Sequence, residues 1–120
     1  MCIRDRPTVY CTWYHAGASN EKDIIRNAAF AREHLAPYGF SVIQIDDKWQ
    51  DGAPIEGPRK NFTTHRADGP YPSGMAPTAA KLERLGMTPG IWFMPFAGTW
   101  DDPFFADKQE MFAQKDGKPY

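Results

Sequence analysis

The sequence predicts an α/β protein with a parallel sheet, and three observations support this fold class. Apolar, β-forming runs alternate along the chain with stretches whose apolar residues recur every three or four positions. Glycine and proline punctuate these stretches, with ten Gly and eleven Pro in 120 residues. Helices between successive strands return the chain to the same end of a sheet, which makes the strands parallel.

The first strand and helix are predicted in residues 8–35. Residues 8–14 are rich in β-formers, and Ser19 or Asn20 can cap the helix that follows. Pro37 and Gly39 end that helix. Its apolar face repeats at helical spacing through Ile24, Ala28, Ala31 and Leu35.

A second strand is predicted at 41–45 and a third at 88–94. Between them, a region dense in Gly and Pro predicts a loop over 51–74, and a helix is predicted over 75–85. Gly86 supplies the left-handed residue that ends many helices.

The two ends of the chain are expected to differ. Residues 1–6 resemble a translated sequencing-adapter remnant, so we leave them out of the fold prediction. At the other end, a loop is predicted at 95–103, a short helix at 104–113 and a turn at 116–119.

The composition argues against several kinds of partner. A net charge of −1 and a pI near 6.3, with no cluster of basic residues, give no footprint for nucleic acid or for an anionic membrane surface. No apolar run reaches the ~20 residues of a membrane span. Two cysteines, Cys2 and Cys11, are too few for a disulfide framework, and Cys11 in an apolar strand predicts a reduced, packed thiol.

The second strand ends in two acids, Asp46 and Asp47, followed by Trp49. Ligands of parallel α/β proteins bind beyond the carboxyl ends of the strands. Carboxylates accept hydrogen bonds from hydroxyl groups, and an aromatic face covers the C–H side of a sugar ring. A polyhydroxylated ligand is therefore predicted. A solvated turn, a helix cap or a magnesium site are the alternatives for such a pair.

Strand order alone does not separate an open sheet from a closed barrel. The first strand is followed by His15-Ala16-Gly17-Ala18, with no G-x-G-x-x-G and no P-loop. This disfavours an open nucleotide-binding sheet and therefore favours a closed barrel.

Four motifs, in this order, resemble the first part of the catalytic barrel of α-galactosidases, glycoside hydrolase families 36 and 27 (the melibiase group). The family pattern runs Trp-x-Trp/Tyr, Asp-Asp-Gly-Trp-Gln, Phe-Pro-x-Gly-Met and Gly-Leu-x-Pro-Gly-Ile-Trp. The corresponding stretches here are Trp13-Tyr14, Asp46-Asp47-Lys48-Trp49-Gln50, Tyr71-Pro72-Ser73-Gly74-Met75 and Gly86-Met87-Thr88-Pro89-Gly90-Ile91-Trp92.

The resemblance implies a partial (β/α)₈ TIM barrel, with its first three βα units and parallel strands in residues 7–120. It implies a retaining glycosidase of carbohydrate metabolism that hydrolyses terminal α-galactosides, with an oligosaccharide or α-galactoside as substrate. Asp46 and Asp47 would bind sugar hydroxyls, and Trp13 and Trp92 would line the same pocket.

The family's nucleophile and acid/base follow the fourth and sixth strands. No catalytic residue is therefore expected in this chain, which would be inactive alone, and neither a cofactor nor a metal is expected. Lys48 replaces the family's glycine, a departure that leaves the preferred sugar open. An α-glucosidase fragment, a raffinose-synthase-type transglycosylase fragment and a small non-catalytic carbohydrate-binding protein remain alternatives.

Overall fold

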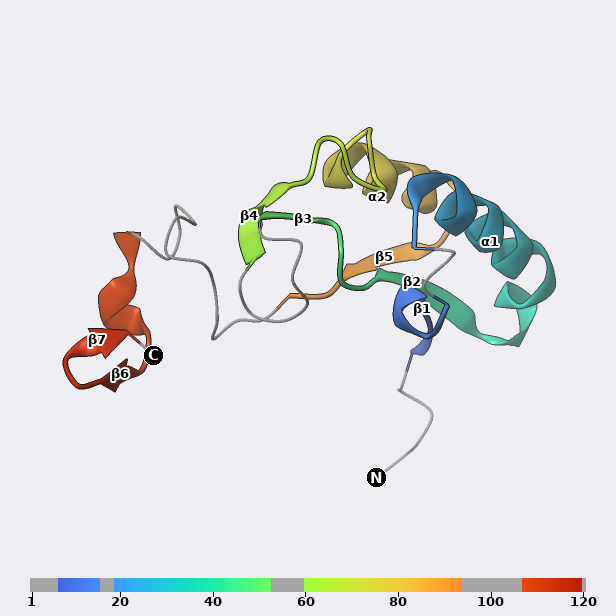
Figure 1. Ribbon diagram of the computed structural model, residues 1–120. Coiled ribbons are helices and arrows are strands. Elements are labelled where there is room, and N and C mark those ends of the chain that lie inside the picture. Colours follow the sequence, from blue (N-terminus) through green and yellow to red (C-terminus); the bar gives the residue numbers. More distant parts are fainter. Residues whose placement is uncertain (1–6, 16–18, 53–59, 94–106, 120) are drawn as a thin grey trace, which may run out of the picture.

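A three-stranded parallel sheet forms the centre of the fold (Figure 1). In this computed structural model, residues 7–15, 19–52, 60–93 and 107–119 are described. The strands stand in the order β1-β2-β5 and both neighbouring pairs are parallel; their bounds are β1 Thr8–Cys11, β2 Phe40–Ile45 and β5 Thr88–Ile91. The predicted α/β class with a parallel sheet is confirmed.

Helix α1 (Glu21–His34) connects the first two strands of the sheet. It begins as predicted, because the Asn20 side chain accepts a hydrogen bond from the Asp23 backbone N–H at 2.9 Å and so caps the first turn. A 3₁₀ turn, η4 (Ala36–Tyr38), follows the helix, and Gly39 at φ +90° turns the chain into β2.

Helix α2 (Met75–Arg84) ends through local hydrogen bonds that glycine permits. Gly86 lies at φ +75°, its N–H bonds the Glu83 carbonyl, and the Met87 N–H bonds the Leu82 carbonyl. This is the Schellman arrangement, and it satisfies carbonyls that the helix itself leaves unpaired. The predicted role of Gly86 is confirmed.

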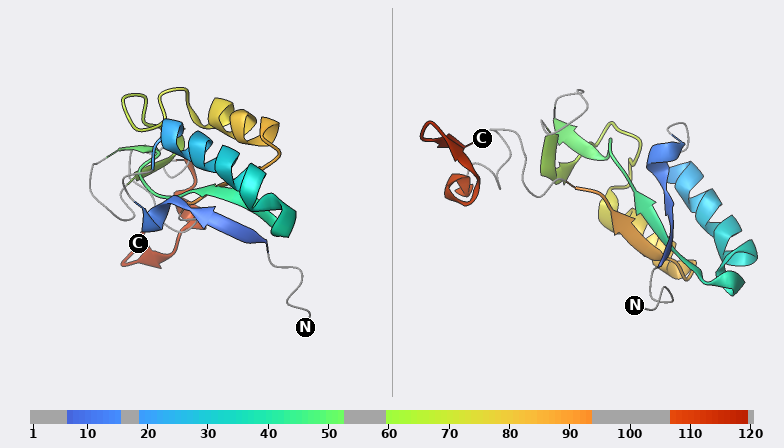
Figure 2. Two further views of the ribbon diagram at one scale, coloured as in Figure 1. Left: turned by 90° about the vertical axis from the view of Figure 1, so that its right-hand side faces the viewer. Right: turned by 90° about the horizontal axis from the view of Figure 1, so that it is seen from below.

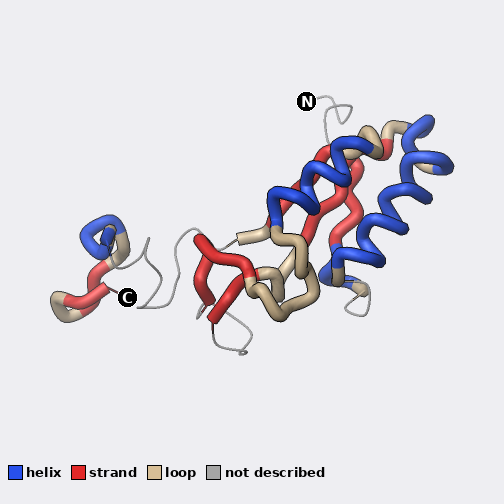
Figure 3. The backbone as a smooth tube through the Cα atoms, turned by 90° about the horizontal axis from the view of Figure 1, so that it is seen from above, coloured by secondary structure: helices blue, strands red, loops and turns tan. Residues whose placement is uncertain are grey.

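Both helices lie on the same side of the sheet (Figures 1 and 3). The core between them and the strands is built from the helix-facing residues of β2 and the apolar stripes of both helices: Ile24, Ala28, Ala31, Ile43, Ile45 and Leu82, each no more than 4% exposed. The core therefore follows from one alternating strand and two amphipathic helices.

The strand predicted at 8–14 is shorter than expected. The extended backbone of β1 ends at Cys11, and Thr12–Tyr14 form a 3₁₀ turn, η2. The strand predicted at 88–94 is also shorter than expected, because β5 ends at Ile91 and Trp92 and Phe93 are not in a strand; Met94 lies outside the described residues.

The prediction of a loop throughout 51–74 is wrong. An antiparallel hairpin, β3 (Gln50–Gly52) with β4 (Lys60–His65), occupies part of this region (Figure 2). Gly and Pro cluster on either side of β4, whereas β4 itself contains Phe62, Thr63 and Thr64, which are good strand formers.

The C-terminal part contains a 3₁₀ turn, η5 (Gln109–Met111), and a short hairpin formed by β6 (Gln114–Lys115) and β7 (Lys118–Pro119). The turn predicted at 116–119 lies within this hairpin. The helix predicted at 104–113 does not continue through residues 109–113, where the 3₁₀ turn is followed by residues outside any helix. The part before residue 107 lies outside the described residues, as do the loop at 95–103 and residues 1–6.

Candidate functional site

The residues predicted to bind the ligand all follow the carboxyl ends of the three parallel strands. Trp13 follows β1, Asp46 and Asp47 follow β2, and Trp92 follows β5. Parallel strands bring these ends to one edge of the sheet. The Trp92 N–H donates to the Ile45 carbonyl at 2.8 Å, so the register extends past the last paired residues and sets Trp92 beside Asp46.

Asp46 is held in place by groups on two strands and in its own turn. Its backbone N–H donates to Thr12 Oγ1 at 2.9 Å, and its Oδ1 accepts the Asp47 N–H at 2.8 Å. Its Oδ2 accepts from Cys11 Sγ at 3.1 Å and from Gln44 Nε2 at 3.4 Å. A carboxylate offers about four acceptor positions. The side chain therefore keeps capacity for a further donor while its orientation is fixed.

Asp47 is also buried, with 5% of its surface exposed. A solvated turn, one of the alternatives for the acidic pair, does not fit two carboxylates that are each less than a tenth exposed. Buried carboxylates are stabilised only where donors surround them, as they surround Asp46.

The three tryptophans of this region lie in different surroundings. Trp49 is buried in the core, and its Nε1–H donates to the Trp92 carbonyl at 2.9 Å. Trp92 is half-buried, and Trp13 is 52% exposed. The Trp49–Trp92 bond ties the turn after the acids to the end of β5. Trp100 lies outside the described residues.

Cys11 carries a free thiol directed at Asp46. Burial raises the pKa of this thiol, and the hydrogen bond to Asp46 and its negative charge raise the pKa further, outweighing a backbone hydrogen bond from Trp13. The thiol is therefore a hydrogen-bond donor at neutral pH, which stabilises the Asp46 carboxylate.

Lys48 adopts a backbone conformation that favours glycine, at φ +83°. Its N–H donates to Gln50 Oε1 at 3.1 Å, which closes the turn, and its side chain is exposed. Glycine, the residue of the family pattern at this position, adopts such a φ without steric cost. The lysine here maintains the same turn at a conformational cost.

Thr12 and Gln44 were not among the predicted site residues, yet both bond Asp46. Neither belongs to a recognisable local motif. Gln44 carried a usable signal, because it lies two residues before Asp46 in a strand and therefore on the same face. Thr12 had none, since its contact spans 34 positions of sequence.

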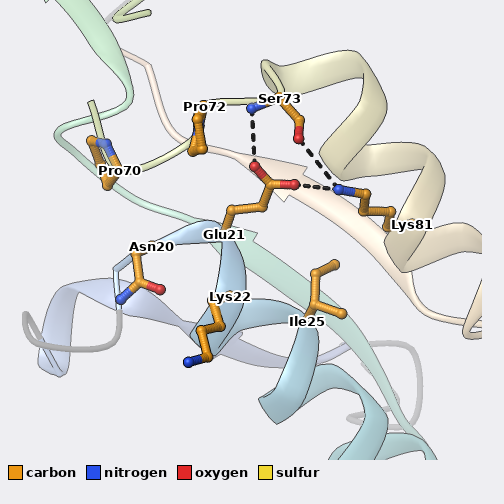
Figure 4. Close-up of a pocket in the computed structure, with 8 residues that line it drawn as sticks. All are labelled: Asn20, Glu21, Lys22, Ile25, Pro70, Pro72, Ser73 and Lys81. Atoms are coloured by element: carbon orange, nitrogen blue, oxygen red, sulfur yellow. Dashed lines mark hydrogen bonds and ion pairs between the residues drawn. The ribbon is translucent and has the colours of Figure 1, made fainter. Parts of the chain in front are cut away.

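The loop that enters α2 is attached to α1 through Glu21, as Figure 4 shows. The Glu21 carboxylate accepts the Ser73 N–H at 3.0 Å and pairs with the Lys81 ammonium, while the Glu21 N–H donates to the Pro70 carbonyl at 2.9 Å. Burial raises the pKa of Glu21, but the bonds from Lys81 and Ser73 outweigh it, and the net pKa is lowered. A cavity of about 590 Å³ lies beside this arrangement.

Two further cavities lie along α2, one of about 260 Å³ next to β5 and one of about 460 Å³ next to Trp49 and His65. None of these three cavities is lined by Asp46 or Asp47. Within residues 7–15, 19–52, 60–93 and 107–119, no three His, Cys, Asp or Glu side chains gather as metal ligands would. In the same ranges, no helix combines the length and hydropathy needed to cross a bilayer.

No protein-family model matches the chain. Solved structures do. The family 36 α-galactosidase AgaA from Geobacillus stearothermophilus is 20% identical with a TM-score of 0.68, and the match covers 97% of this chain and 16% of that one. The α-galactosidase TtGalA from Thermus thermophilus, in complex with stachyose, is 31% identical with a TM-score of 0.56, covering 94% and 22%.

A family 27 β-L-arabinopyranosidase from Geobacillus stearothermophilus is 21% identical with a TM-score of 0.58, covering 76% of this chain and 25% of that one. The chain thus spans about a fifth of the length of the α-galactosidases that it matches. Over nearly its whole length, it resembles a segment of α-galactosidases, including one of glycoside hydrolase family 36, and over about three quarters of its length a segment of a family 27 glycoside hydrolase.

Proposed function

We propose that residues 7–120 form the first three βα units of the (β/α)₈ catalytic barrel of an α-galactosidase-like retaining glycosidase. In this proposal, Asp46 and Asp47 bind hydroxyl groups of a terminal α-galactoside. Trp13 and Trp92 line the same pocket and cover the apolar side of the sugar ring.

The observation that carries the proposal is a pair of buried carboxylates where a central parallel strand ends, in a chain shaped like a segment of α-galactosidases. Structures similar to this chain were solved with raffinose, stachyose and p-nitrophenyl α-galactoside. These ligands indicate the class of substrate to test.

Carboxylates suit the role because their hydrogen bonds to hydroxyl groups are charge-assisted and stronger than neutral ones. They also discriminate between sugars. A sugar whose hydroxyl group points the wrong way leaves a desolvated carboxylate oxygen without a donor, at a cost of about 1–3 kcal/mol. An axial and an equatorial 4-hydroxyl group are separated in this way.

Bond cleavage requires two further carboxylates, about 5–5.5 Å apart in a retaining enzyme. They are expected after the fourth and sixth strands of the complete barrel, which lie beyond the three parallel strands β1, β2 and β5 of this chain. The 120 residues alone are therefore proposed to be inactive. A barrel of eight units takes about 250 residues, or about 30 per unit.

The first test is the coding sequence beyond Tyr120. A strand that ends in Asp within about 30–60 residues, one or two further units, supports the proposal. A stop codon at that point in every independent assembly would count against it.

The second test uses the protein from the complete reading frame with p-nitrophenyl α-galactoside as substrate. Asp46→Asn is expected to lower kcat/KM by about 100-fold or more, because a sugar hydroxyl group loses its charged hydrogen-bond acceptor. Preferred cleavage of the α-glucoside, or transfer to sugar acceptors in place of hydrolysis, would replace the galactosidase assignment. Unchanged kinetics in Asp46→Asn would remove Asp46 from the site.

A further inference from the structure

Three hydroxyl groups from distant parts of the chain meet next to the backbone of Asp46. Thr12 comes from the turn after β1, Ser19 precedes α1, and Tyr71 precedes α2. Ser19 Oγ donates to Thr12 Oγ1 at 3.3 Å, and Ser19 Oγ lies 3.3 Å from the Tyr71 hydroxyl oxygen.

Both of these contacts have a donor that can be assigned. Since Ser19 donates its one hydroxyl proton to Thr12, its oxygen is left to accept from the Tyr71 O–H. The three groups therefore form a hydrogen-bonded chain from Tyr71 through Ser19 to Thr12. Bonds in such a chain polarise one another.

The Thr12 oxygen accepts the Asp46 backbone N–H at 2.9 Å. Thr12 and Tyr71 are each about 1% exposed, so water does not compete for these bonds. The segment that carries Tyr71 is hydrogen-bonded to Glu21 of α1 on either side of the tyrosine. The Pro70 carbonyl accepts the Glu21 N–H, and the Ser73 N–H donates to the Glu21 carboxylate (Figure 4).

We infer that Thr12 is a positioning residue for the sugar-binding carboxylate of Asp46, and that Ser19 and Tyr71 set the orientation of its hydroxyl group. The inference rests on the proposed function. Thr12 does not touch the sugar. It holds the main chain of Asp46 where β2 ends, and the beginnings of α1 and α2 thereby determine where the carboxylate stands.

The chain offers a matched set of variants. Thr12→Val removes the hydroxyl group and keeps the branched shape, whereas Thr12→Ser keeps the hydroxyl group. Tyr71→Phe removes the hydroxyl group that bonds Ser19. Tyr10→Phe is its control, because the Tyr10 hydroxyl group accepts from Asn27 on the helix side of the sheet at 3.0 Å and is not bonded to Asp46.

The experiment uses the protein from the complete reading frame and measures three quantities for each variant. These are kcat/KM for p-nitrophenyl α-galactoside, the thermal midpoint, and the hydrogen-exchange rate of the peptide that contains the Asp46 amide. We expect Thr12→Val to lower kcat/KM by about 10-fold and to speed exchange at Asp46. Thr12→Ser should restore both to within about 2-fold of the wild type.

Tyr71→Phe should lower kcat/KM by about 3-fold, whereas Tyr10→Phe should leave it unchanged even if both lower the thermal midpoint equally. If Thr12→Val does not fold, the comparison of Tyr71→Phe with Tyr10→Phe still tests whether the hydroxyl groups around Thr12 position Asp46. Equal effects of Tyr71→Phe and Tyr10→Phe on kcat/KM, or unchanged exchange at Asp46 in Thr12→Val, would overturn the inference.

Failure of the proposed function gives a different pattern. The wild type would then neither cleave nor bind the galactoside, while Thr12→Val would still speed exchange at Asp46 and Thr12→Ser would not. That result overturns the galactoside assignment, and the sugar-positioning role with it, although the contact between Thr12 and Asp46 stands.

Discussion

Adjacent residues of β2 lie in different surroundings, because the two faces of the parallel sheet are covered to different extents. Ile43 and Ile45 point toward α1 and α2 and are almost fully buried. Val42 and Gln44 point the other way and are half-buried, and Val9, paired with Val42, is 41% exposed. We call these the helix face and the open face.

The helix face is completed by neighbours in sequence, since each helix packs on the strands that it connects. The open face carries the residues that we propose to bind the sugar. Cys11 and Gln44 are paired across β1 and β2 on this face, and both donate to Asp46. In the proposed barrel this face would point to the interior. The proposal therefore assigns stability and function to opposite sides of one sheet.

The largest expected effect tests the helix face. Ile43→Ala should lower the free energy of unfolding by about 2–5 kcal/mol, because it leaves a cavity between β2 and the helices. Val42→Ala on the open face should cost less than about 1 kcal/mol in the 120-residue chain. Urea denaturation followed by tryptophan fluorescence measures both.

Val42→Ala, compared between the 120-residue chain and the protein from the complete reading frame, tests whether the open face becomes a barrel interior. In the protein from the complete reading frame, Val42→Ala should cost about 1–2 kcal/mol or more, since Val42 would then be packed. An equally small cost in both proteins would contradict a closed barrel.

A smaller effect concerns Glu21, which joins the two helices. Glu21→Gln should lower the free energy of unfolding by about 1–3 kcal/mol at pH 7, since it removes a largely buried charged acceptor. The lowered pKa of Glu21 means that its contribution is present above the ordinary value of 4.5 and is lost as the pH falls through the folded-state pKa.

The difference in stability between the wild type and Glu21→Gln should therefore shrink as the pH falls below 4.5. Thermal unfolding between pH 3 and 7 measures it. Glu33→Gln is the control, because the Glu33 side chain is largely exposed and lies 3.8 Å from His34, itself half exposed. A difference that grows toward low pH would contradict the assigned role of Glu21.

Lys48→Gly should raise the stability by up to about 1 kcal/mol. Glycine adopts φ +83° without the steric cost that lysine bears, although it loses more chain entropy on folding. Lys48→Ala retains the steric cost and serves as the comparison. Thermal midpoints measure the stability of both variants. A gain in stability from alanine equal to that from glycine would show that removal of the lysine charge, not relief of the backbone, is responsible.

The smallest expected effect is on the reactivity of Cys11. Asp46→Asn removes a charge that raises the pKa of the thiol, so alkylation by iodoacetamide at pH 8 should become about 3-fold faster. The increase is modest because burial, the largest cause of the raised pKa, remains. A slower reaction in Asp46→Asn would contradict the contact between Cys11 and Asp46.

Local sequence signals determined much of the fold. Asn20 as a cap, Gly86 as a left-handed residue and the apolar spacing of α1 placed both helices nearly as observed. The alternation of strands and helices indicated a parallel sheet, and the same logic put Asp46 at its carboxyl edge. Each of these signals depends on residues within a few positions of one another, so it is legible without a structure.

Only the tertiary structure decided what surrounds the acids. Glu21 lies in the first turn of α1, but its side-chain partners lie 52 and 60 positions away in the sequence. Thr12 meets Asp46 across 34 positions, and Ser19 meets Tyr71 across 52. Such contacts arise because parallel strands bring the ends of separate segments to one edge of the sheet. A periodic pattern records which face of an element is apolar, whereas the partner of a single polar group is set by how the elements pack.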